Sequence, residues 1–84
     1  MSDEQPGLSL YDGMQLSGMT FREFWLRQVT VGGVADELAV EAYTLGLLTP
    51  GPLEYNILAQ ALNEHFLERG QDHPVAYRGR ANAP

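Results

Sequence analysis

The chain has 84 residues, enough for one domain with a modest core, and it contains no cysteine, which excludes a disulfide framework and a thiolate metal site. Eleven acidic and five basic residues give a formal net charge of −6, and an acidic surface repels nucleic acid and anionic lipid. No run of about 18 apolar residues is present to form a transmembrane helix.

Residues 1–7 are polar and acidic, whereas a secretory signal begins with basic residues and continues with apolar ones. We therefore expect a flexible leader and a cytoplasmic protein. Every basic residue is arginine, a preference typical of GC-rich coding sequences, which indicates a bacterial or phage origin.

The segment 8–17 contains the pair Asp12-Gly13, which suits the two-residue turn of a β-hairpin. The facing positions of such a hairpin do not form a clean apolar face, and a lone hairpin is marginally stable. An extended strap that packs Leu10, Met14 and Leu16 onto the helices is an equal alternative.

A first helix is predicted over residues 20–31. Thr20 and Glu23 have the spacing of a capping box, in which each side chain accepts a hydrogen bond from the backbone N–H of the other residue. Met19 and Phe24 are spaced to form a hydrophobic staple across this cap.

A second helix is predicted over residues 34–45, and its apolar positions recur at the three-and-four spacing of one buried face. That predicted face consists of Val34, Leu38, Ala42 and Leu45. Gly46 is expected to cap the helix, and Leu47 and Leu48, in the proline-rich connection that follows, are expected to be buried.

The clearest helix is predicted over residues 52–69. Pro52 suits its first position, Arg69 lies in its last turn, and Gly70 can adopt the left-handed conformation after its end. The helical spacing predicts one buried face. This face consists of Tyr55, Leu58, Ala59, Leu62 and Phe66.

Together these elements predict an all-α or mainly α domain over residues 8–70. We expect a small three-helix bundle, with the N-terminal hairpin or strap laid across it. Residues 71–84 are expected to form a flexible tail without a core of its own.

No catalytic or metal-binding pattern is evident. His65 and His73 lie on either side of the break at Gly70, so they do not converge as metal ligands. Glu37 and Glu41 share a helical face, but carboxylates near a helix start are favoured for electrostatic reasons alone. We therefore expect no enzyme activity, no metal and no cofactor.

A helix-turn-helix DNA-binding regulator is the alternative function, because Ala42 and Gly46 resemble the small residue and turn glycine of that motif. No lysine or arginine lies between residues 34 and 68 to contact phosphates, so nucleic acid is an unfavourable partner. The arginines available for phosphate contacts are Arg22, Arg27, Arg78 and Arg80, and Asn56 and Gln60 could read bases.

A protein-protein interaction module, acting as an adaptor, regulator or inhibitor, is the function that these observations favour. The partner is another protein, for which a basic surface would match the acidic chain, and homo-oligomerisation is also open. Aromatic side chains are frequent binding anchors, and charged side chains form the rim of an interface. The predicted partner-binding residues are Trp25, Tyr43, Glu37, Glu41, Glu54, Gln60, Glu64, Tyr77, Arg78 and Arg80.

Overall fold

The computed structural model describes residues 7–71 and 74–77, and this part of the chain contains four helices. They are α1 (Leu10–Ser17), α2 (Phe21–Thr30), α3 (Glu37–Leu45) and α4 (Pro52–Glu68). The mainly α class is therefore confirmed, with one helix more than the predicted three. None of the described helices is both long enough and apolar enough to cross a membrane.

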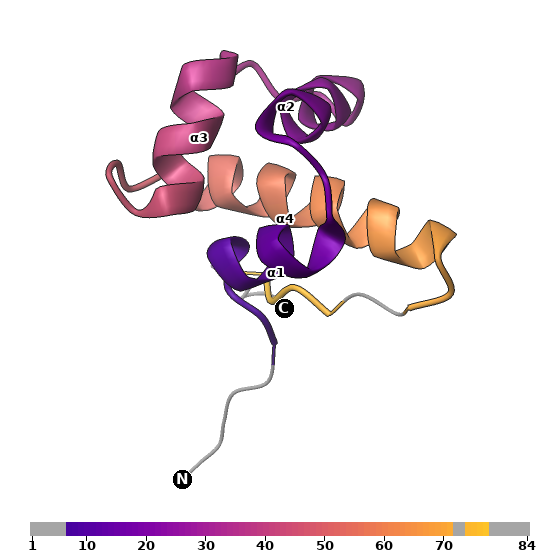
Figure 1. The fold of residues 1–84 in the computed structure, drawn as a ribbon. Coiled ribbons are helices and arrows are strands. Elements are labelled where there is room, and N and C mark those ends of the chain that lie inside the picture. Colours follow the sequence, from indigo (N-terminus) through magenta and orange to yellow (C-terminus); the bar gives the residue numbers. More distant parts are fainter. Residues whose placement is uncertain (1–6, 72–73, 78–84) are drawn as a thin grey trace, which may run out of the picture.

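Helix α4 runs through the centre of the molecule, with α1 on one side and α2 and α3 on the other (Figure 1). It packs against α1 and α2, while α3 packs against α2 and α1. The buried face of α4 is the predicted one, and its five predicted residues are each 7% exposed or less. Ala61 and Asn63 of α4 are also fully buried, so the core surrounds more of this helix than one apolar stripe indicates.

The segment predicted as a hairpin or strap is instead helix α1. Ser9 caps it by accepting a hydrogen bond from the backbone N–H of Asp12 at 3.0 Å, and Gly18 ends it with a positive φ of 75°. Leu10 and Met14, four positions apart, are both 5% exposed, whereas Leu16, which was also expected to pack onto the helices, is 65% exposed. The Asp-Gly pair is thus part of a helix whose inner face contributes to the core.

The ends of α2 and α4 follow the sequence signals. Thr20 and Glu23 form the predicted capping box, with hydrogen bonds of 2.8 and 3.1 Å. Pro52 occupies the first turn of α4, and Gly70 follows its end with a φ of 82°. These local interactions place α2 and α4 as predicted.

The segment 74–77 is packed against the body, unlike the predicted tail without a core. Val75 is 1% exposed, and its backbone N–H and C=O bond the side chain of Asn63 at 2.8 and 2.9 Å. On its other side the segment pairs with Leu8 in a parallel bridge. Arg78 and Arg80 lie outside the described residues.

Candidate functional site

The outward side of α3 is apolar and exposed to solvent. Leu38 is 75% exposed and Leu45 is 43% exposed, and Ala42 lies between them on the same side of the helix. Val34, three residues before the helix start at Glu37, is 91% exposed. The predicted buried stripe of this helix therefore faces the solvent, and that prediction is wrong.

The chain that leaves α3 extends this apolar surface. Gly46 has a φ of 81°, which lets the chain fold back so that the Leu47 N–H donates to the carbonyl of Ala42 at 2.9 Å. Leu47 is 75% exposed and Leu48 is 52% exposed, so the prediction that both are buried is also wrong. We call Leu38, Ala42, Leu45 and Leu47 the outer face of α3.

The opposite side of α3 forms the contact with the core. Val40 is completely buried and Thr44 is 3% exposed. The Thr44 hydroxyl donates to the Val40 carbonyl at 2.7 Å, so the hydroxyl is buried with a hydrogen-bond partner. The core contact of α3 is therefore made by a valine and a hydrogen-bonded threonine, while its leucines lie on the solvent side.

The charged side chains beside the outer face are acidic. Asp36 caps α3 by accepting from the Ala39 N–H at 2.8 Å, and Glu37 pairs with Arg22 at 3.4 Å. Glu41 forms no ion pair with any residue that the structure describes. The sequence has no lysine or arginine from residue 34 to residue 68, and among the described residues it is Arg22 of α2 that pairs with an acidic side chain of α3.

The two predicted aromatic anchors are engaged within the protein. The Trp25 indole N–H donates to the carbonyl of Ala35 at 3.1 Å, and the Gln28 side chain donates to the same oxygen at 2.9 Å. The Tyr43 hydroxyl donates to Glu54 at 3.4 Å, and desolvation, followed by the negative charge of Glu54, raises its pKa. Both aromatic side chains are half-buried and help to fix α3 to its neighbours.

The remaining predicted partner-binding residues do not form one continuous rim. Glu54 accepts from the Gly51 N–H at 3.2 Å and so caps α4. Gln60 and Glu64 bond each other at 3.2 Å on α4, and Glu64 is near enough to Arg27 of α2 to raise its pKa. Tyr77 is 41% exposed. Of the predicted carboxylates, Glu37 and Glu41 belong to the same helix as the outer face.

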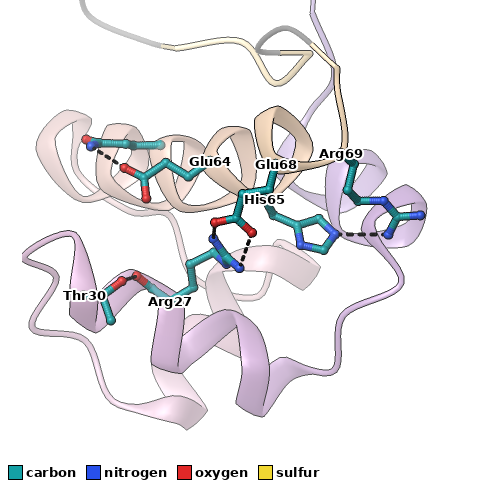
Figure 2. A network of polar contacts seen from close by, with 7 residues as sticks. Arg27, Thr30, Glu64, His65, Glu68 and Arg69 are labelled. Atoms are coloured by element: carbon teal, nitrogen blue, oxygen red, sulfur yellow. Dashed lines mark hydrogen bonds and ion pairs between the residues drawn. The ribbon is translucent and has the colours of Figure 1, made fainter.

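A polar cluster joins α2 to the end of α4, on the side where α1 ends (Figure 2). Arg27 donates two hydrogen bonds to Glu68, at 3.0 and 3.1 Å, and these bonds are the main reason why the pKa of Glu68 is lowered. The nearby His65 ring and Arg69 contact the carbonyl of Ser17, the last residue of α1, at 3.0 and 3.3 Å. Cations are favoured at a helix C-terminus, so a structural role explains this cluster.

Two features of the described residues bear on metal binding and catalysis. They contain no group of three or more histidine or acidic side chains that could hold a metal ion. A groove of about 250 Å³ between α1 and the chain after α3 includes Tyr11, Tyr43 and Tyr55 in its lining, with no carboxylate or imidazole. Acid-base chemistry at neutral pH normally uses a carboxylate or imidazole, so this groove is not the candidate site.

No family model matches the chain, and no curated protein or solved structure shows significant similarity to it. The candidate site is therefore defined by geometry alone, and it is the outer face of α3 with the acidic side chains beside it.

Proposed function

We propose that this protein is a cytoplasmic protein-protein interaction module that binds a partner through the outer face of α3. The observation that carries the proposal is the exposure of Leu38 and Leu47, each 75%, together with Leu45 at 43%, on α3 and the turn that follows it. Contiguous apolar surface that is exposed and bordered by polar groups marks interaction sites in proteins. An adaptor, a regulator and an inhibitor would all use such a surface.

A partner that covers the outer face of α3 gains the free energy of burying leucine side chains that folding leaves exposed. Full burial of a leucine side chain contributes about 1.5–3 kcal/mol. Leu38 and Leu47 receive little of this in the folded chain, so a partner that covers both gains most of it. Residues of this kind form the apolar centre of an interface, and Glu37 and Glu41 are placed to form its rim.

The helix-turn-helix alternative lacks a comparable observation. Arg27 is held by Glu68, and Arg22 pairs with Glu37. Arg27 is engaged by a carboxylate of its own chain through two hydrogen bonds, which leaves Arg22, weakly paired, as a single exposed cation of α2, whereas phosphate contacts require several cations that are free to meet the DNA backbone. The described surface therefore supports protein binding in preference to DNA binding.

Site-specific photo-crosslinking tests the proposal. A benzophenone amino acid is introduced at position 38, and in a matched control at position 67, because Leu67 of α4 is also exposed, at 51%. In cells that naturally produce the protein, we expect a discrete crosslinked protein from position 38 and none from position 67. Crosslinking from position 67 alone would place the interaction surface elsewhere and contradict the proposal.

A further inference from the structure

We infer that the partner docks as an amphipathic helix that carries lysine or arginine beside its apolar stripe; this inference rests on the proposed function. The outer face of α3 has apolar residues at positions i, i+4 and i+7, namely Leu38, Ala42 and Leu45. This spacing is that of anchors on a helix that packs against another helix. The small Ala42 at the centre allows a second helix to approach closely.

The acidic residues of α3 lie along one edge of this stripe. Glu41 is three positions after Leu38 and four before Leu45, so it is their neighbour on the helix surface. Glu37 lies one turn earlier on the same edge. Arg22 contacts Glu37 at 3.4 Å, but its side chain is 69% exposed, and an ion pair in water contributes little, so a partner's cation can compete with it.

A second copy of the chain fits this edge poorly. When two identical helices pack antiparallel about a two-fold axis, each edge faces its own counterpart, so Glu41 would lie beside Glu41 of the other copy. In a parallel arrangement Glu41 would face the opposite edge of the stripe, where α3 also has no cation. Neither arrangement supplies a positive charge from α3, and like charges at an interface oppose association.

The C-terminal residues 78–84 of the same chain are also a poor match. They include Arg78 and Arg80, which could satisfy the acidic edge, but their apolar side chains are two alanines and a proline. Such a segment lacks the large side chains needed to cover Leu38, Leu45 and Leu47. A foreign helix with both an apolar stripe and flanking cations satisfies both requirements.

Two synthetic helical peptides test the inference. Both have the same leucine stripe, and they differ only in the flanking positions, which are arginine in one and glutamine in the other. Binding to the full chain is measured by isothermal titration calorimetry at low and at physiological salt. We expect the arginine peptide to bind about tenfold more tightly than the glutamine peptide at low salt, with a difference that narrows as salt rises.

Matched variants assign the binding to α3. Leu38→Gln combined with Leu45→Gln should weaken binding of the arginine peptide at least about tenfold, which corresponds to the loss of about 1.4 kcal/mol. The control pair Leu26→Gln and Val29→Gln changes two residues of α2 whose exposure, 49% and 46%, is close to the 43% of Leu45, and it should leave binding unchanged. Glu41→Gln should reduce both affinity and salt dependence, whereas Glu64→Gln on α4 should not.

The outcomes separate this inference from the proposed function. Equal binding of both peptides would overturn the charge requirement, and unchanged binding to the α3 double variant would overturn the site. If position 38 crosslinks a partner but neither peptide binds, the inference fails while the proposed function stands. A dimer in sedimentation equilibrium that dissociates on the Leu38 and Leu45 changes would assign the face to a second copy and also overturn the inference.

Discussion

The side of the molecule formed by α1, α4 and residues 74–77 differs sharply from the outer face of α3. On the first side Val75 is 1% exposed, and its backbone N–H and C=O bond the side chain of Asn63. Leu8 lies opposite Val75 in a parallel bridge and bonds the backbone of the flanking residues Pro74 and Ala76. On the second side Leu38 and Leu47 are each 75% exposed. Both surfaces belong to one small domain with a limited supply of apolar side chains.

The domain completes its core without the exposed leucines of α3. Val75, far along the chain, fills a core position next to Gly13 and Leu62, and Val40 and Thr44 form the inner side of α3. Exposed apolar residues also occur on the other helices, but Leu38, Leu45 and Leu47 lie on α3 and the turn that follows it. This grouping is the basis of the proposed binding role.

The largest expected difference between the two sides is in the free energy of unfolding after a leucine-to-alanine change on each side. Leu62 is completely buried in α4, so Leu62→Ala should lower the free energy of unfolding by about 2–5 kcal/mol, through lost burial and a cavity. Leu38→Ala should change it by no more than about 0.5 kcal/mol. Urea unfolding followed by circular dichroism measures both, and a large loss for Leu38→Ala would mean that α3 uses this residue for folding.

The buried amide of Asn63 should give the next largest effect. Asn63→Leu removes both hydrogen bonds to Val75 and leaves a buried N–H and C=O without partners, which should cost about 2–3 kcal/mol. The control Gln60→Leu, on the exposed side of α4, should be close to neutral. Equal unfolding midpoints for the two variants in urea would show that residues 74–77 add little to stability.

The smallest expected effect concerns Glu68, whose pKa is lowered mainly by its hydrogen bonds with Arg27. A carboxyl with a lower pKa in the folded state stabilises the fold above its unfolded-state pKa, and this contribution disappears as the pH falls through the folded-state pKa. Because the Glu68 side chain is 63% exposed, the contribution is small.

Glu68→Gln should therefore reduce the urea midpoint slightly near neutral pH, and the difference from the unmodified chain should vanish in acid. Glu41→Gln, which removes a carboxylate without an ion pair among the described residues, is the control and should leave the urea midpoint near neutral pH unchanged. A difference that instead grows as the pH falls would contradict the assigned sign.

Local signals in the sequence were sufficient for α2 and α4, because the capping box at Thr20 and the turn at Gly70 depend on residues within a few positions of each other. They were insufficient for α1. A side chain added at Gly13 would have its Cβ only 2.7 Å from Val75, so this glycine is explained by a residue 62 positions away in the sequence. A pattern of neighbouring residues in the sequence cannot predict a contact over that separation.

The candidate site was missed for a related reason. The spacing of the apolar residues predicts the stripe of α3, but periodicity does not tell which side of a helix the rest of the fold covers. The buried side is set by Val40 and by Thr44, whose hydroxyl bonds within the helix. The acidic residues Glu37 and Glu41 were nominated from the sequence, whereas the proposed anchors Trp25 and Tyr43 are held internally.

Mapping the binding of the arginine peptide by NMR tests the central claim most directly. Backbone amide signals of the labelled chain are followed during the titration. The account predicts shift changes concentrated in α3 and residues 46–48, with little change at Leu8 and residues 74–77. Shift changes confined to the α1 and C-terminal side, with α3 unaffected, would contradict it.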